Sequence, residues 1–491
     1  MTNLTIWLTP IWLLAVGVTM GAVVLVAAWL LCLGVNRRLA STIRETIAEG
    51  ILLQISYTVI ASVVLAVVAA PIMPVDRLIT SLKRLPHVGT IEKEVTVPAS
   101  TPDHLLEISF RADELQSYFI TTSEDIAINT ETAKGFVDPL LTVDGGSTGE
   151  PSYEWTPGST AERVFDQDVQ SLLISNESDL PTTVTVRVVT DVEMPEVHYL
   201  PITAAGVVGL FLLYLLVRWL APRVSVLATA TAKEAVSQPV FLLLMIVGVA
   251  ALVAYIYIPY NTFGEDVKML KSTGMTTIKV LAIVMALWTA SVSVAEEIEG
   301  RTALTVLSKP ISRRQFILGK FLGIVWPIVL MFVLLGIVFL ISVSYKVVYD
   351  ARESAKTSPE WQLCFEELIR IVPGLLLAFM EAVVLAAISV AVSTRLSMLP
   401  NLVICGSIYV LGHLGPLIVN SAAGKIVFVR FIGRLISVVF PVLDHYEIEG
   451  AIAGSASVPP SYLLNAALYS LLYCAAAMLL ALIFFEDRDL A

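Results

Sequence analysis

The chain has 491 residues, of which 56% are hydrophobic and 15% charged, and its mean hydropathy is +0.81. Soluble domains are about 45–50% apolar and about 25% charged, so this composition excludes a soluble enzyme and a disordered chain. The net charge of −11 opposes binding to nucleic-acid phosphates. The composition therefore predicts an integral membrane protein.

Nine apolar stretches are long enough to cross a bilayer as helices, which takes about 20 residues. In chain order they are 11–35, 51–72, 202–220, 240–258, 276–294, 321–344, 372–394, 399–419 and 463–485. Arg37 and Arg38 follow the first stretch, so the positive-inside rule places its C-terminal end in the cytoplasm. No Lys or Arg precedes that stretch, which argues against a signal peptide. We expect a polytopic α-helical membrane protein with its N-terminus outside and its C-terminus in the cytoplasm.

The long hydrophilic segment 74–198, between the second and third stretches, carries eight basic and 22 acidic residues. Its net charge of −14 exceeds that of the whole chain, so the acidity belongs to one external domain. Apolar and polar residues alternate as in half-buried strands, and the candidates are 105–111, 118–121, 126–128 and 183–189. This pattern predicts an all-β, sandwich-like domain. His104 near Asp103 and Glu107 reads as solvated surface rather than as a metal site.

A charged elbow lies between the fifth and sixth stretches. Its glutamates, Glu296, Glu297 and Glu299, follow the end of a span, and Pro310 ends the short helix after them. Ser312 is positioned to cap the next helix, and the basic residues Arg313, Arg314 and Lys320 are expected at the inner headgroups. Ordinary juxtamembrane charge explains the basic residues but not three glutamates at the cytoplasmic end of a span.

The elbow resembles the hallmark of the ABC-2 type permeases, the export-type membrane subunits of ABC transporters. The matching residues are Glu297-Ile-Glu299, Thr302, Leu307, Lys309-Pro-Ile-Ser-Arg313, Phe316 and Gly319-Lys320. In that family the segment docks on the ATPase subunit, which implies coupling roles for Glu296, Glu297, Glu299, Arg301, Thr302, Lys309, Pro310, Arg313 and Arg314. The segment 231–241 is similar to the family's elbow helix, with Lys233 and Glu234, and Phe484–Leu490 resembles its usual ending except at Asp487.

The resemblance covers about 229–491 and implies a six-helix permease core there. The remaining parts are 1–73, two N-terminal helices with a cytoplasmic elbow, the external domain 74–198, and 199–228, a third helix with its cytoplasmic connection. Three basic residues, Lys425, Arg430 and Arg434, then fall on the outer side. In the family this region forms short external or re-entrant helices, which would accommodate them.

The chain has no glycine-rich loop that ends in Gly-Lys-Ser/Thr, since neither Gly319-Lys320 nor Gly424-Lys425 is followed by Ser or Thr, so we expect no ATP hydrolysis by that route. We therefore expect no catalytic residue, metal or cofactor in this chain, with ATP and Mg²⁺ bound by a separate ATPase subunit. The resemblance also implies a second permease copy, identical or different, in a bacterial plasma (inner) membrane. The external domain offers a surface for an outside partner, and the spans contact lipid.

Glu381 lies near the middle of the seventh apolar stretch, where a charge is costly and usually functional. It either lines or gates the transport pathway, or it holds helices together. Two other functions stay open for the chain: a non-transporting sensor or scaffold that uses the external domain, and an ion-coupled secondary transporter. The last of these requires several buried ionisable residues in related halves.

Overall fold

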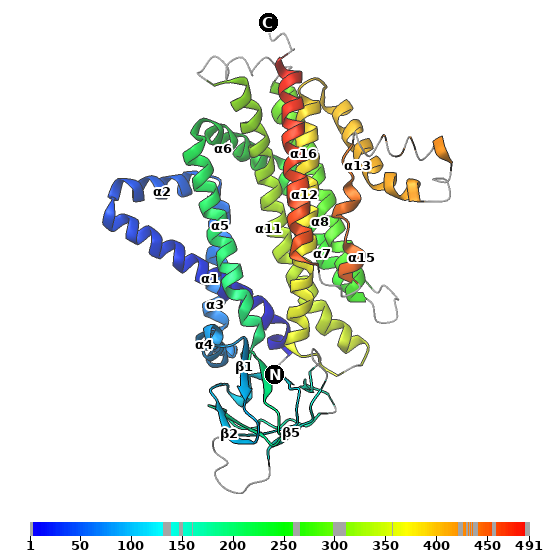
Figure 1. Cartoon of the computed structure of the whole chain (residues 1–491). Helices are drawn as coiled ribbons and strands as arrows, with labels where there is room; N and C mark the ends of the chain where they lie inside the picture. Colours follow the sequence, from blue (N-terminus) through cyan, green and yellow to red (C-terminus); the bar gives the residue numbers. More distant parts are fainter. Residues whose placement is uncertain are drawn as a thin grey trace. The chain divides into compact units, whose positions relative to one another are not determined.

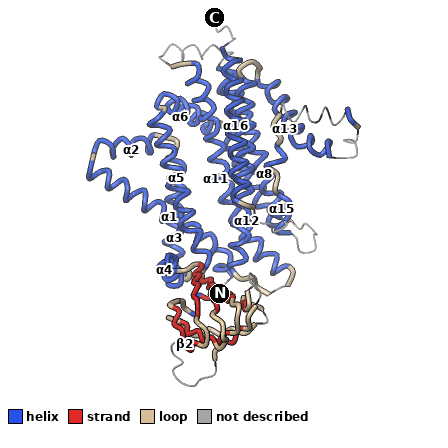
Figure 2. Tube along the Cα trace, in the orientation of Figure 1, coloured by secondary structure: helices blue, strands red, loops and turns tan. Residues whose placement is uncertain are grey.

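The structure is a computed structural model, and it describes residues 3–130, 139–146, 151–159, 161–258, 266–297, 311–355, 357–420, 426–428, 431, 433, 435, 440–453 and 458–486. The chain divides into two compact units. The first comprises Met1–Ala69 and Leu200–Ala491, and the second is Ala70–Tyr199. Helix dominates the first unit, and the described strands all belong to the second (Figure 2).

The helical unit consists of long helices joined by shorter ones (Figure 1). Its helices are α1 (Asn3–Val35), α2 (Arg37–Glu49), α3 (Leu52–Ala69), α5 (Tyr199–Leu220), α6 (Pro222–Ser237), α7 (Pro239–Tyr257), α8 (Asp266–Ala290), α11 (Arg313–Glu353), α12 (Trp361–Ser393), α13 (Met398–Asn420), α15 (Glu449–Ala453) and α16 (Pro460–Glu486), with a short 3₁₀ turn η7 (Leu443–Tyr446).

Eight of the described helices are long and apolar enough to cross a membrane, and they cover eight of the nine predicted stretches. The remaining prediction, 399–419, falls on α13, whose apolar part is described from Met398 to Leu414. The membrane-spanning helical architecture is therefore confirmed. The total of nine and the orientation in the bilayer stay predictions.

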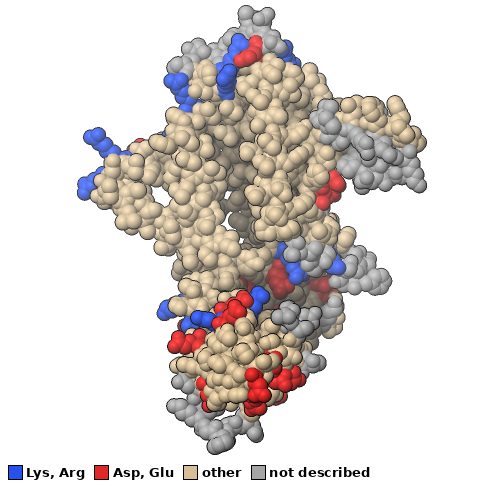
Figure 3. Space-filling model, viewed as in Figure 1, with Lys and Arg blue, Asp and Glu red and all other residues tan. Residues whose placement is uncertain are grey.

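The interior of the helical unit is formed by α8, α11 and α12, whose apolar stretches are mostly buried. Those of α3 and α5 are largely exposed. On the face shown in Figure 3 most of the helical unit is uncharged, with a few charged groups at its left and right edges, and Lys and Arg gather near the end of α16. Helices that face a bilayer need a wide apolar surface with polar residues at the ends.

The helix α11 is 41 residues long and extends well beyond the predicted stretch 321–344. At 1.5 Å per residue it spans about 60 Å, roughly twice the hydrocarbon thickness. Its start is fixed by a capping box, because the Gln315 amide donates to Ser312 Oγ at 3.3 Å and the Ser312 amide donates to Gln315 Oε1 at 3.1 Å. The predicted cap at Ser312 is confirmed.

The second unit holds two four-stranded antiparallel sheets, with strand orders β1-β8-β3-β6 and β2-β7-β4-β5. The strands are β1 (Thr90–Val97), β2 (Thr101–Leu106), β3 (Leu115–Thr121), β4 (Ile126–Thr130), β5 (Leu141–Val143), β6 (Tyr153–Trp155), β7 (Leu172–Asn176) and β8 (Thr182–Thr190). Inward residues of both sheets, among them Tyr118, Ile128, Ile174 and Val186, share one hydrophobic cluster. The helix α4 (Val75–Arg84) precedes the strands. The predicted small β region is confirmed.

Three of the four predicted strands lie within observed ones, and the prediction of a strand over 105–111 is wrong. The alternation there is real, since Leu106, Ile108 and Phe110 are all buried. However, β2 ends at Leu106, and beyond it only Phe110 pairs, through an isolated bridge to Val169. Alternating burial therefore does not ensure that the backbone finds a strand to pair with.

Candidate functional site

The elbow segment 295–314 begins where α8 ends. The six residues Ser291–Glu296 form a π-helix rather than a further turn of α-helix. Short π-helical turns are rare overall, but where they occur they often lie at functional sites. The structure describes the elbow segment as far as Glu297 and again from Ile311 onward.

An ion pair connects Glu297, near the start of the elbow segment, to α11 beyond the end of that segment. Lys320 Nζ, on α11, donates to Glu297 Oε1 at 2.6 Å. The Lys320 side chain is only 3% exposed, whereas that of Glu297 is 24% exposed. A buried ammonium needs a charged partner, since desolvation is otherwise uncompensated. The expectation that Lys320 lies at the headgroups is therefore wrong, because its charge is used inside the helical unit.

Arg313 connects the same end of α11 to the end of α16. Its Nη1 donates to the backbone carbonyl of Glu486 at 2.9 Å and approaches that of Phe485 at 3.4 Å. The last carbonyls of a helix have no partner within the helix and carry partial negative charge, so a guanidinium there is stabilising. The Phe485 ring is fully buried and stacks on Phe316, with 5.5 Å between the ring centroids. Arg314, by contrast, is exposed.

The predicted elbow helix is the C-terminal half of α6, which packs closely along α11. A Cβ on Gly319 would lie 2.8 Å from a Leu227 methyl carbon, and one on Gly323 would lie 2.6 Å from Thr231 Cβ. Glycines four residues apart let two helices approach closely in a membrane. Only residues without a side chain fit at this crossing, so the Gly319 of the hallmark is explained by contact with α6.

Glu381, on α12, is fully buried and joins three elements. Its Oε2 lies 3.5 Å from Lys279 Nζ on α8, and its Oε1 lies 3.4 Å from His413 Nε2 on α13. The same His413 nitrogen is 3.9 Å from Glu447, near η7. His413 Nδ1 is 3.0 Å from the Tyr409 carbonyl, which only accepts a hydrogen bond. With a proton on Nδ1, Nε2 faces a carboxyl oxygen of Glu381.

A family model for the ABC-2 family transporter proteins matches residues 240–490, which is just over half of the chain. The chain belongs to the ABC-2 family of transporter proteins. A comparison with curated proteins found no match. Members of this family are transmembrane subunits that are not themselves catalytic and that normally work with an ATPase subunit. This ABC-2 protein is therefore an integral membrane protein and a permease.

The family match covers α7 to α16 of the permease. It therefore includes the elbow segment, Glu381 and the ion pair of Glu297 with Lys320. The helices α1 to α6 and the β unit lie outside it.

The structure describes only some of the residues that the resemblance implies for coupling. Glu297, Arg313 and Arg314 have described side chains, and Glu296 has a described backbone. Lys233 and Glu234 lie exposed in the last two turns of α6. The other coupling candidates lie outside the described residues: Glu299, Arg301, Thr302, Lys309 and Pro310. The same holds for Lys425, Arg430 and Arg434.

Sequence reasoning missed three buried lysines of the permease. Lys279 pairs with Glu381, Lys271 on α8 pairs with Glu367 on α12, and Lys346 on α11 lies 3.5 Å from Asp266. Lys346 also donates to the Ile256 carbonyl at 3.1 Å. Lys279 could have been recognised from the sequence, since a charged residue inside the predicted span 276–294 is unusual. Within the described residues no group of three metal-ligating side chains is present.

Proposed function

We propose that this permease is the membrane subunit of an ABC exporter and is driven by ATP that a separate nucleotide-binding subunit hydrolyses. ATP and Mg²⁺ bind to that subunit, which docks on the elbow segment 295–314. Two permease copies, identical or different, together enclose the transport pathway, because six core spans are half of a pathway in this family.

The ion pair between Glu297 and Lys320 is the observation that supports this proposal most. The pair closes the base of a segment that leaves α8 and returns into α11. Both helices belong to the interior of the helical unit. A movement imposed on such a closed segment is transmitted to two core helices instead of being absorbed by a loose loop. Arg313 extends the connection to α16, and the crossing at Gly319 and Gly323 extends it to α6.

The proposed orientation follows the positive-inside rule. The elbow segment and the C-terminus lie in the cytoplasm, and the acidic β unit lies outside a bacterial plasma membrane. This is consistent with the gathering of Lys and Arg near the end of α16 in Figure 3.

The test is co-purification of the permease with the ATPase encoded beside it. Replacing Glu297 and Glu299 together by alanine should abolish recovery of the ATPase and ATP-dependent transport. A matched control removes the same charge elsewhere, by replacing Glu353 and Glu360, which are exposed in the connection between α11 and α12. Normal ATPase recovery with the elbow variant would refute the docking site. A wild-type permease that recovers no ATPase would favour a scaffold or an ion-coupled transporter.

A further inference from the structure

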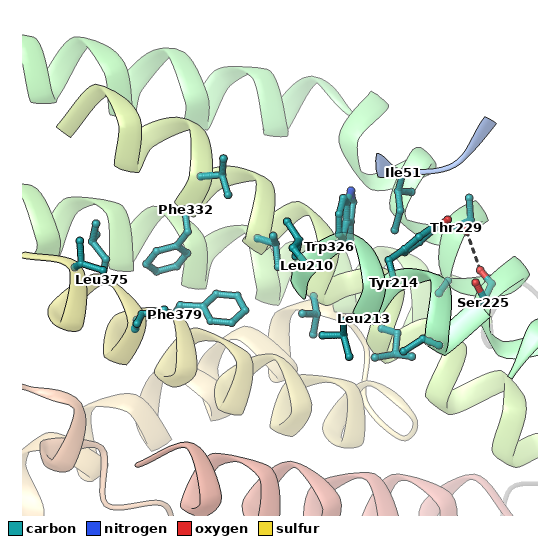
Figure 4. Close-up of a pocket in the computed structure, with 18 residues that line it drawn as sticks. Ile51, Leu210, Leu213, Tyr214, Ser225, Thr229, Trp326, Phe332, Leu375 and Phe379 are labelled. Atoms are coloured by element: carbon teal, nitrogen blue, oxygen red, sulfur yellow. Dashed lines mark hydrogen bonds between the residues drawn. The ribbon is translucent and has the colours of Figure 1, made fainter. Parts of the chain in front are cut away.

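A large apolar cavity lies within the helical unit, between α5, α6, α11 and α12 (Figure 4). Its volume is about 520 Å³, which is within the range of roughly 300–1,000 Å³ typical of small-molecule sites. Its wall is almost entirely hydrocarbon and aromatic, with Leu213, Trp326, Phe332 and Phe379 among its residues. The hydroxyl of Thr229, one of the few polar groups in the wall, donates to the Ser225 carbonyl of its own helix at 2.8 Å. Such a wall favours hydrocarbon over water.

A second cavity of about 330 Å³ adjoins the first, and both are lined by Ile51. The second cavity is more polar. Lys233 of α6 lines it, together with Gln54 of α3 and the turn between α2 and α3. Lys233 is an exposed cation, and Gln54 Oε1 is a buried acceptor without a hydrogen-bond donor in the structure. The wall of this polar cavity therefore contains one cationic side chain and one unpaired acceptor, Gln54 Oε1, beside the apolar cavity.

Tyr214 lies where the two cavities meet. It lines the apolar cavity, and a Cβ on Gly50, which lines the polar one, would lie 2.7 Å from the Tyr214 hydroxyl. The Tyr214 hydroxyl and Trp326 Nε1 are buried and have no hydrogen-bond partner in the structure. Leaving such a group unpaired costs about 1–3 kcal/mol. The absence of a side chain at Gly50 keeps the junction open beside that hydroxyl.

We infer that the two cavities bind one glycerophospholipid whose headgroup carries a hydrogen-bond donor. An acyl chain fills the apolar cavity, the phosphate lies against Lys233, and the headgroup donor pairs with Gln54 Oε1. The geometry of the helices agrees with this arrangement. The apolar cavity is lined by candidate membrane spans, and the polar cavity lies at the start of α3 and near the end of α6, where headgroups meet a helix end. The site joins α3 and α5, which lie outside the family match, to the permease core.

The inference goes beyond the proposed function, because the bound lipid holds α5 and the turn before α3 against the core and need not be the transported substrate. Its test therefore uses binding, with no ATPase present. The full chain is purified in detergent, and native mass spectrometry counts retained lipid after addition of phosphatidylglycerol or of phosphatidylcholine with the same acyl chains. Phosphatidylcholine has the phosphate but no headgroup donor. We expect one phosphatidylglycerol per chain and markedly less phosphatidylcholine.

Two pairs of variants locate the site. Val329→Phe narrows the apolar cavity and should reduce retention, whereas Ile337→Phe, on the same helix but outside the cavity wall, should not. Lys233→Gln should weaken binding about fivefold, since one Lys near the headgroups contributes about 1 kcal/mol. Arg223→Gln, also exposed on α6 but outside both cavities, is its control.

Equal retention by Val329→Phe and wild type would overturn the inference, as would equal binding of the two lipids. If Val329→Phe fails to fold, the Lys233 and Arg223 pair still decides.

Discussion

Glu297 Oε1 and Lys320 Nζ lie 2.6 Å apart although 23 residues separate them in the chain. The two residues are near the opposite ends of the hallmark by which the chain resembles its family. The first glutamate and the last lysine of the hallmark therefore form an ion pair and neutralise each other inside the helical unit. The glutamate is the more accessible of the two, and among the described residues it is the ion-pair partner of the buried lysine.

The two single substitutions at this pair should differ in their cost. Glu297→Gln leaves the Lys320 ammonium buried and unpaired, and we expect a loss of about 3–5 kcal/mol in the free energy of unfolding. Lys320→Met leaves Glu297, which reaches water, and the loss should be about 1 kcal/mol or less, as for an exposed pair. Denaturant unfolding of the purified permease measures both. Equal losses would contradict the assignment of the buried charge to Lys320.

The crossing of α6 and α11 predicts a position-specific effect of alanine. Gly323→Ala places a Cβ 2.6 Å from Thr231 Cβ and 2.8 Å from the Ala228 carbonyl oxygen, so α6 must move away. We expect a loss of about 1–3 kcal/mol. Gly336→Ala on the same helix is the control, because the nearest atom to its Cβ is 3.8 Å away and alanine favours a helix by up to about 1 kcal/mol. Thermal unfolding of the two variants should therefore shift in opposite directions.

The apolar helices were predictable because each needs only a long run of one residue class, and eight such runs appear as helices. The helix start at Ser312 was predictable for a similar reason, since a capping box is a local pattern. Ion pairs between helices are not local. Nothing near Lys271 or Lys346 in the chain indicates that Glu367 or Asp266 lies opposite, so their burial follows only from packing.

In the β unit, too, the sequence predicts local patterns better than contacts between elements. The strand β8 alternates strictly along nine residues and was recognisable, whereas β1 is rich in charge and only Val97 within it is buried. An edge strand such as β1 is held by hydrogen bonds to β8, and its sequence carries little hydrophobic signal. The role of Glu381 stayed open for a related reason, because the sequence did not reveal that Lys279 and His413 surround it.

Tyr118 gives the β unit a pH dependence in alkali. Burial raises the pKa of its phenol above the usual value near 10, because desolvation disfavours the phenolate. The unfolded chain therefore releases this proton above about pH 10 while the folded unit retains it, so stability is lost as the pH rises beyond that point. Tyr118→Phe should be less stable at pH 8, since it loses the hydrogen bond to the Glu162 carbonyl, but should decline less between pH 8 and pH 11.

Hydrogen exchange of peptides from β3 and β8 measures this effect in the full chain. Comparing wild type and Tyr118→Phe at the same pH removes the intrinsic acceleration of exchange by hydroxide. The difference between the two proteins should shrink as the pH rises. A difference that stays constant would show that ionisation of Tyr118 does not contribute to alkaline unfolding.

The surroundings of Glu381 predict that it holds α8, α12 and α13 together. Glu381→Gln and Lys279→Met should each cost about 3–5 kcal/mol, because each removes one member of a buried ion pair. The double variant should cost less than the sum, with a coupling of about 1–3 kcal/mol. Glu366→Gln is the matched control on α12, since Glu366 is exposed and forms a surface ion pair with Arg370 one turn along the same helix. Its effect should stay below about 0.5 kcal/mol.

Transport measured on the same variants separates the two roles that the sequence left open for Glu381. If the residue joins helices, transport should fall in proportion to stability and should recover partly in the double variant, where no buried charge is unpaired. If it lines the pathway, Glu381→Gln should lose transport at nearly unchanged stability, and Lys279→Met should not rescue it. We expect the first result, because the carboxyl oxygens of Glu381 face Lys279 and His413 from two other helices and the side chain is closed to solvent.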